Sequence, residues 1–373
     1  MKLDFGTKDT RYLLIIKSSF LFWGGVCSIF VGLKALLIGL VFFIFCCSFK
    51  SHNSNSSEKV SSLNLKILIA ILISIVVFKL PEFLQSLSSF FSHDAVNKVI
   101  EDANNNISKG RSFFELFSLF TSLIPFIILD SRSQLGVRTK RFIYFLIVVN
   151  FIIVSGISRG MVSIIIISIV LPQINNLKKI VIFGSIFVLF YHFISIYRDG
   201  TDNNYIVNPV VDSFVFPGFN LALLNAKQVY LSSIDYISQF FLKFVPSFLF
   251  DKNIFSFNIE MTKIIYPFMG DEVSSISVFT YLGDLFVYKP LILTLIFSII
   301  VVRFILKYII YYISKYQFKI TSIYIALYCF IALRSRIYDL LSTLILYLFL
   351  LIIIDVVNRI DIDGCKIKYT PAR

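Results

Sequence analysis

Charged residues are scarce in this sequence. Asp, Glu, Lys and Arg make up 15% of the 373 residues, and hydrophobic residues make up 57%, whereas soluble domains carry about a quarter charged residues. Such a chain has too little charged surface to stay dispersed in water, so we expect lipid to be its solvent. Because backbone polar groups in hydrocarbon must pair within the protein, the structure must be helical or a closed barrel.

Motifs for disulfides, metals and nucleotides are also missing. The five cysteines include the adjacent pair Cys46-Cys47, whose spacing suits neither a disulfide nor a zinc site. The three histidines show no metal-ligand spacing. Gly-rich phosphate loops and nucleophile elbows are absent. We therefore expect no metal and no cofactor, and we interpret the cysteines as apolar filler.

Long apolar runs are what the sequence does contain. Leu344–Ile354 is continuously apolar and Ile164–Leu171 is apolar except for Ser168, without the alternation of a barrel strand, which favours helices. Because one span takes about 20 residues, we predict an all-α, polytopic transmembrane bundle of about ten spans, in a range of roughly nine to twelve. Residues 1–373 then form a single integral membrane domain. The predicted spans are Tyr12–Val31, Leu33–Phe49, Leu63–Leu80, Phe113–Leu129, Phe142–Ser158, Met161–Ile174, Ile180–Tyr197, Pro290–Leu306, Ile320–Leu333 and Tyr338–Val356.

The distribution of charge predicts the orientation of these spans. The net charge of +13 could indicate nucleic acid in a soluble protein, but lysine and arginine of a membrane protein collect in cytoplasmic loops. With the N-terminus inside, the inner segments hold 20 Lys and Arg against 6 Asp and Glu, and the outer segments hold 12 against 14. We therefore predict that both termini are cytoplasmic and that nucleic acid is no partner. No small-residue cleavage site follows the first apolar run, so we interpret that run as retained helices.

Two outer loops are long. The first, 81–111, begins with an amphipathic piece at Glu82–Phe91. The second, 198–287, is too apolar for a disordered linker, and Phe219–Leu231 and Ile234–Val245 carry apolar residues at helical spacing. We expect these two segments to be short helices along the membrane surface. No internal repeat is visible, which argues against the two halves of a transporter.

Four arginines depart from this charge pattern. Arg159, Arg198, Arg334 and Arg336 lie at predicted outer helix ends, where cations are disfavoured, and none of the four is lysine. The planar guanidinium group binds phosphate and carboxylate in a bidentate manner. A pyrophosphate at the outer membrane surface would offset the free energy of placing these cations there. Snorkelling and local pairing, such as Arg198 with Asp199, are the alternative.

The surroundings of the arginines supply further candidate residues. Arg159 lies in a tight turn of small residues between two spans, which lets a backbone approach a ligand closely. Tyr197 precedes Arg198, and Tyr281 lies in the segment that ends the large loop. In that segment Asp284 is the carboxylate nearest a span, which makes it the first candidate for a general base; the vicinal acids Asp271-Glu272 are the alternative.

Four motifs in order resemble the O-antigen polymerase (Wzy) family of bacterial polysaccharide assembly, over roughly residues 140–300. A Gly-x-Ser-Arg-Gly turn at Gly156–Gly160 joins two spans, and Tyr-Arg-x-Gly at Tyr197–Gly200 follows the next span. The large outer loop then contains Phe244–Lys252, and Ser275–Lys289 leads to a late span. The glycine that the family has after that approach is replaced here by Tyr288-Lys289-Pro290.

The resemblance implies a membrane glycosyltransferase of the bacterial inner membrane. Such enzymes join undecaprenyl-pyrophosphate-linked oligosaccharide repeat units at the periplasmic face, in lipopolysaccharide or capsule-like polysaccharide synthesis, and work with a flippase and a chain-length regulator. Carried over to this chain, the four arginines with Tyr197 and Tyr281 would bind pyrophosphate and glycan. Arg159, Arg198 and Asp284 would take part in catalysis. No cofactor is required, because the donor is already activated.

Three other functions compete with this one. An O-antigen ligase would share the arginines and the large loop. A polysaccharide flippase should have about twelve spans, charges within them, short loops and two halves, whereas the spans predicted here are nearly free of charge and one outer loop is very long. A sugar acyltransferase should carry a histidine paired with an arginine near the first spans, which is missing.

Overall fold

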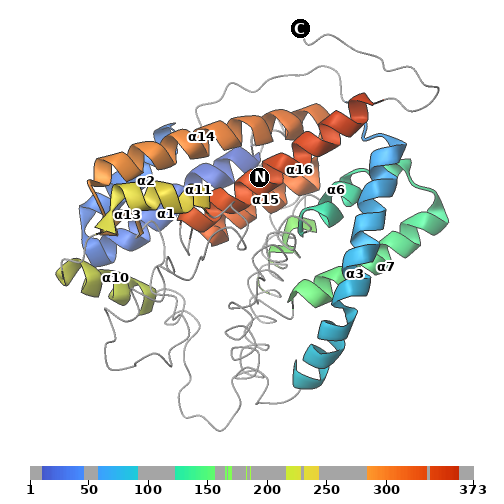
Figure 1. Ribbon diagram of the computed structural model, residues 1–373, viewed down its shortest axis with the longest axis horizontal. Coiled ribbons are helices and arrows are strands. Elements are labelled where there is room, and N and C mark those ends of the chain that lie inside the picture. The colour runs from blue at the N-terminus through green and yellow to red at the C-terminus, as the bar shows by residue number, and fades with distance from the viewer. Residues whose placement is uncertain are drawn as a thin grey trace.

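The structure is a computed structural model that describes residues 11–45, 58–90, 122–155, 164–165, 167–169, 182, 185, 216–227, 231–242, 284–333 and 337–360 (Figure 1). This part of the chain is mostly α-helical, and its described strands are a single pair of two residues each. The all-α prediction is therefore confirmed for the described residues. The elements are α1 (Arg11–Val31), α2 (Leu33–Phe45), α3 (Ser62–Phe90), α6 (Ile124–Asp130), the 3-10 helix η2 (Arg132–Gln134), α7 (Val137–Ser155), α10 (Phe216–Ala226), β1 (Leu231–Ser232), α11 (Ser233–Leu242), α13 (Asp284–Val287), β2 (Tyr288–Lys289), α14 (Leu291–Tyr316), α15 (Lys319–Ala332) and α16 (Ile337–Arg359).

Helices α1 and α2 form a hairpin. They are separated by Gly32, whose φ of +82° favours glycine. The two backbones approach closely at two other glycines: a Cβ atom on Gly24 would lie 2.9 Å from the Cα atom of Gly39. The rings of Phe20 and Phe42 stack beside this contact with centroids 5.0 Å apart. Small residues at a helix contact are the usual means of close packing between membrane helices.

Helices α14, α15 and α16 pack together, and α16 is the most deeply buried of them. Leu340, Leu341 and Leu344 of α16 are fully buried. Hydroxyl groups in this interior bond to one another: Tyr324 donates to Ser122 at 3.0 Å, and Tyr347 lies 3.1 Å from both hydroxyls. Buried hydroxyls that pair in this way avoid the free-energy penalty of an unsatisfied polar group in an apolar interior.

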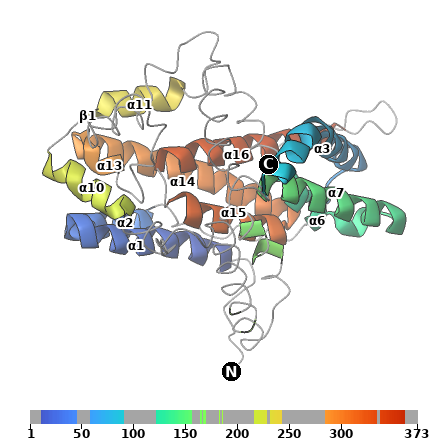
Figure 2. The same ribbon diagram turned by 90° about the horizontal axis from the view of Figure 1, so that it is seen from below.

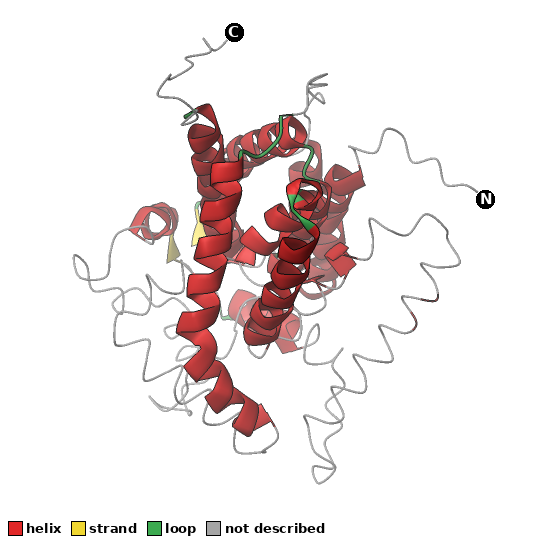
Figure 3. Ribbon diagram, turned by 90° about the vertical axis from the view of Figure 1, so that its right-hand side faces the viewer, coloured by secondary structure: helices red, strands yellow, loops and turns green. Residues whose placement is uncertain are grey.

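Helices α3 and α7 form a second group. They pack against each other (Figure 3), and α3 is steeply inclined to α14 and α16 (Figure 1). The two groups meet where α3 begins and α16 ends, because the side chain of Asn64 donates to the backbone oxygen of Ile354 at 2.8 Å. From that meeting point the helices diverge rather than forming one parallel bundle.

The outer surfaces of the helices are apolar. Exposed large hydrophobic residues are spread along the helices, such as Leu37 on α2, Phe145 on α7, and Ile292 and Phe304 on α14. Three helical segments are long and apolar enough to cross a membrane: Tyr12–Val31, Leu291–Tyr316 and Leu340–Arg359. Leu33–Phe45, Ser62–Val77 and Lys319–Ala332 are shorter apolar helices. Helices of this length with apolar outer surfaces make the chain a membrane protein.

Several predicted spans coincide with helices, and two of them are too short. The predictions at residues 12–31, 320–333 and 338–356 agree with α1, α15 and α16. The prediction at 290–306 ended ten residues early, since α14 continues to Tyr316 and buries Ile309 and Ile313. Likewise α3 continues to Phe90, so the amphipathic piece Glu82–Phe91 belongs largely to α3. An apolar-length criterion stops at the first polar residues, whereas α14 continues through them because one of its faces stays buried.

The remaining predictions are described only in part. For Leu33–Phe49 and Phe142–Ser158 the described residues are helical, as α2 and α7. Of Phe113–Leu129 the structure describes the last eight residues, which are helical from Ile124. Met161–Ile174 and Ile180–Tyr197 lie almost entirely outside the described residues. Of the two short helices predicted in the large loop, Phe219–Leu231 is helical as α10 up to Ala226, and Leu231 belongs to β1. Ile234–Val245 is helical as α11 up to Leu242, and residues 228–230 and 243–245 lie outside the described part of the chain.

Candidate functional site

Of the residues predicted to form the site, the structure describes only the position of Asp284. Asp284 is the first residue of α13, immediately before β2 and α14. The other predicted site residues lie outside the described residues, so the structure neither brings them together nor separates them. They are Arg159, Tyr197, Arg198, Tyr281, Arg334 and Arg336.

Asp284 belongs to a cluster of short elements that we call the loop end: α10, α11, α13, β1 and β2. Figure 2 shows α10, α11 and α13 at one end of α1 and α14, whereas α3, α6 and α7 lie at the other end. Strands β1 and β2 pair in parallel, with Leu231 opposite Tyr288 and Ser232 opposite Lys289. Strand β1 of the predicted outer loop is thus joined to the residues that directly follow that loop, close to Asp284 in sequence.

Helix α11 is fixed to α14 by hydroxyl groups and aromatic rings. Ser233 donates to the backbone oxygen of Pro290 at 2.8 Å, and the hydroxyls of Tyr236 and Ser298 lie 3.0 Å apart. The ring of Phe240 meets that of Phe297 edge to face, with centroids 5.4 Å apart. An aromatic pair of this kind adds about 0.5–1.5 kcal/mol of stabilisation beyond the burial of its apolar area. The apolar face of α11 is therefore packed on α14.

Helix α10 is packed against α1 and α13. Its Gly218 lies directly against the ring of Phe30, since a Cβ atom there would be 2.2 Å from that ring. The indole nitrogen of Trp23 donates to the backbone oxygen of Phe330 at 2.6 Å, which joins α1 to the last turn of α15. Helix α1 therefore links the loop end to the helix that leads into residues 334–336. Leu333 and Ile337, the residues on either side of 334–336, are fully buried.

A network of charged side chains, which we call the polar end, holds the opposite ends of α14 and α16 together. Asp355, 3% exposed, accepts from Lys315 at 2.6 Å and from the hydroxyl of Tyr316 at 2.8 Å, and pairs with Arg359 at 2.7 Å. Lys315 also pairs with Glu58, ahead of α3, at 3.1 Å. The last residues of α14 and α16 therefore lie beside the start of α3.

Asp130 joins two more helices to the polar end. One of its carboxylate oxygens accepts from the backbone N–H groups of Lys319 and Ile320 at 3.1 and 2.9 Å. The other accepts from the backbone N–H and the hydroxyl of Thr321 at 2.9 and 2.8 Å. Burial raises the pKa of the Asp130 carboxyl, and these hydrogen bonds oppose the rise. A carboxylate at a helix N-terminus satisfies free N–H groups and interacts favourably with the helix dipole, so the end of α6 fixes the start of α15.

The helix ends at the polar end are those that the charge pattern assigns to one side of the membrane. The predicted topology places the starts of α3 and α15 and the ends of α6, α14 and α16 on the inner side. The contacts of Glu58, Asp130 and Asp355 gather these five ends in one place. The sequence reading missed the network itself, although Asp355 was visible as a carboxylate within the last predicted span, where ionisable residues are rare and paired.

Chemically, the described residues offer carboxylates at both ends and no metal centre. No group of three or more His, Cys, Asp or Glu that could hold a metal ion occurs within the described ranges. The carboxylates of the polar end are occupied by cations and backbone N–H groups, which indicates a structural role. No family model, curated protein or solved structure matches the chain.

Proposed function

We propose that this protein is a polymerase that joins oligosaccharide repeat units carried on undecaprenyl pyrophosphate. The observation that carries the proposal is the group of four arginines at predicted outer helix ends, Arg159, Arg198, Arg334 and Arg336. Cations are disfavoured on that side, and a doubly charged pyrophosphate is a counter-charge that the substrate itself would bring. The resemblance of residues 140–300 to the O-antigen polymerase family supports the same reaction.

Two features of the fold support the proposal. Three of the arginines are close in sequence to the end of α7 at Ser155, the end of α15 at Ala332 and the start of α16 at Ile337. These three helix ends lie away from the polar end. In addition, α10 and α11 of the predicted large loop are packed on α1 and α14. A lipid-linked substrate requires a site at the membrane surface with such a scaffold beneath it.

The proposed reaction is a glycosyl transfer. A hydroxyl at the non-reducing end of the incoming unit attacks the anomeric carbon at the reducing end of the growing chain. A new carbon–oxygen bond forms, and the bond from that carbon to the pyrophosphate oxygen breaks. Undecaprenyl pyrophosphate leaves with the electron pair of that bond, and guanidinium groups stabilise its growing negative charge. A base takes the hydroxyl proton, and Asp284 is the first candidate because of its position at the loop end.

The proposed location follows from the same orientation. The polar end lies in the cytoplasm, together with both termini, and the loop end faces the periplasm of a bacterial inner membrane. Repeat units then arrive from a flippase already on the periplasmic side, and a chain-length regulator is a partner. The residues proposed to bind glycan beside the arginines are Tyr197 and Tyr281.

Replacement of the arginines in a deletion strain tests the proposal. Each is changed to Ala and to Lys, and the lipopolysaccharide is separated on a gel. We expect the Ala variants to lose the ladder and to leave core with one repeat unit. The Lys variants should lose most of it, since an ammonium group cannot grip pyrophosphate in a bidentate manner. Arg138→Ala, at an exposed residue of α7 on the other side, is the matched control and should keep a full ladder.

The pattern of products separates this function from its competitors. A ligase or a flippase defect leaves bare core, without the single repeat unit. Full ladders from all four Ala variants, at normal protein levels, would contradict the proposed pyrophosphate site. Asp284→Asn tests the proposed base in the same assay, and a full ladder from that variant would remove Asp284 from the mechanism.

A further inference from the structure

The polar end contains a cavity of about 410 Å³. Its walls come from residues 58–60 ahead of α3, the end of α6 with η2, the turn between α14 and α15, and Ile169. It lies on the side opposite the loop end, so it is distinct from the proposed polymerase site. Because it sits where apolar helices end, it opens at the boundary between hydrocarbon and water if the helices span a membrane.

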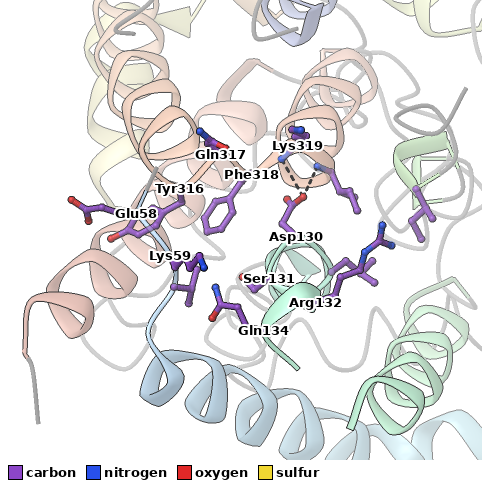
Figure 4. A pocket seen from close by; sticks show the side chains of 14 residues that line it. Glu58, Lys59, Asp130, Ser131, Arg132, Gln134, Tyr316, Gln317, Phe318 and Lys319 are labelled. Carbon is purple, nitrogen blue, oxygen red and sulfur yellow. Dashed lines mark hydrogen bonds between the residues drawn. The ribbon is translucent and has the colours of Figure 1, made fainter. Parts of the chain in front are cut away.

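The two acidic side chains that line the cavity are both engaged elsewhere. Glu58 pairs with Lys315 at 3.1 Å, and in Figure 4 its carboxylate points away from the other lining side chains. Asp130 accepts four hydrogen bonds at the start of α15, including one from the Thr321 hydroxyl at 2.8 Å. Neither carboxylate is therefore free to neutralise a cation of the wall.

Three basic side chains line the same cavity: Lys59, Arg132 and Lys319. All three are exposed, and none pairs with an acidic side chain of the described residues. Arg132 donates to the hydroxyl of Tyr144 at 3.4 Å, which leaves its other N–H groups available. The cavity thus presents three cations to any ligand, together with the exposed amide of Gln134.

The surroundings of the cavity favour a lipid over a free anion. Its floor is apolar and buried, with Leu129 and Phe318 each less than 5% exposed. Beside Arg132, helix α7 carries the exposed apolar side chains of Val137 and Phe142. An anionic phospholipid would place its phosphate among the cations and its acyl chains along these apolar side chains. Basic pockets between membrane helices recognise lipid head groups in this way.

We propose that this cavity binds the phosphate of an anionic phospholipid head group. The cations Lys59, Arg132 and Lys319 contact the phosphate, and the Gln134 amide donates to it. The site is independent of the proposed polymerase activity, because no residue is shared. Occupation by lipid brings α3, α6 and the α14–α15 turn together through one ligand.

A thermal-stability titration of the purified full-length protein in an uncharged detergent tests the site. The probes are dioctanoyl phosphatidylglycerol, dioctanoyl phosphatidylcholine and inorganic phosphate. We expect phosphatidylglycerol to bind about tenfold or more tightly than phosphatidylcholine, since each cation near an anionic head group contributes to affinity. The triple variant Lys59→Gln, Arg132→Gln, Lys319→Gln should lose this preference.

A second triple variant, Lys66→Gln, Arg138→Gln, Arg141→Gln, is the matched control. It removes the same charge from exposed residues near the polar end that do not line the cavity, and it should keep the preference. Equal losses in both variants, or no preference in the wild type, would overturn the site. Binding of inorganic phosphate as tight as that of phosphatidylglycerol would overturn the lipid assignment. If the first triple variant does not purify as a monodisperse protein, the single variants Lys59→Gln and Arg132→Gln replace it. Each single variant should weaken the preference for phosphatidylglycerol. An unchanged preference in both would overturn the site.

Discussion

The two ends of the molecule are held together by different forces. At the polar end, Asp355 joins α14 to α16 through a lysine, a tyrosine and an arginine. At the loop end, α11 is held by hydroxyl pairs such as Tyr236 with Ser298 and by aromatic rings that meet edge to face. A charged network fails sharply when one member is lost, since a buried charge is left unpaired. Many small aromatic and van der Waals contacts fail gradually.

The largest effect is expected at Asp355. Asp355→Ala leaves Lys315, whose side chain is 12% exposed, without its nearest counter-charge. We expect the free energy of unfolding to fall by about 3 kcal/mol, because removing one partner of a buried ion pair is strongly destabilising. Denaturation of the purified protein in mixed micelles measures it. Asp355→Asn should fall between this variant and the wild type, since it keeps an acceptor for Tyr316 but removes the charge.

Asp235→Ala is the control for this variant, because Asp235 is an exposed carboxylate of α11 at the loop end. It should change the free energy of unfolding by less than about 1 kcal/mol, which is the usual size of an exposed charge effect near a helix start. Similar losses from Asp355→Ala and Asp235→Ala would contradict the distinction between the two ends.

A smaller effect is expected at the glycine contact of the α1–α2 hairpin, which also supports α10. Gly39→Ala would place a Cβ atom 2.7 Å from the backbone oxygen of Phe20. Overpacking against a backbone of this kind costs about 1–3 kcal/mol. Gly25→Ala is the matched control, because no atom lies within 4 Å of its new Cβ. In the same denaturation assay Gly25→Ala should keep or slightly raise stability, since Ala favours a helix. Equal losses from both variants would show that the close approach at Gly39 is unimportant.

The sequence was sufficient for the class of the fold and for most helix positions. Apolar runs predicted α1, α15 and α16, because a helix in lipid leaves a composition signal along its whole length. The same criterion misplaced the end of α14 at Leu306, since the polar residues before Tyr316 lie on a helix whose other face is buried. The inclination of α3 to α16 was not predictable, because it is set by tertiary packing rather than by composition.

The candidate site was predictable only as a side of the membrane. Counting charges predicts which helix ends are inner and which are outer, and the contacts of Asp130 and Asp355 bring ends of the predicted inner set together. The pairing itself was not predictable, since Asp355 and Lys315 are 40 residues apart in the chain and meet only through helix packing. The cavity at Lys59 and Arg132 was not predictable for the same reason, because its walls come from segments that are far apart in the sequence.

The most direct test of the account is whether the polar end and the loop end lie on opposite sides of the membrane. Gln134→Cys and Asp235→Cys are placed, one at a time, in a chain whose five cysteines are replaced by alanine or serine. Both positions are exposed, so a membrane-impermeant thiol reagent can reach them. We predict that the reagent, which must first cross the outer membrane, labels Asp235→Cys in intact cells and labels Gln134→Cys only after the inner membrane is permeabilised. Labelling of both in intact cells, or the reverse order, would contradict the account.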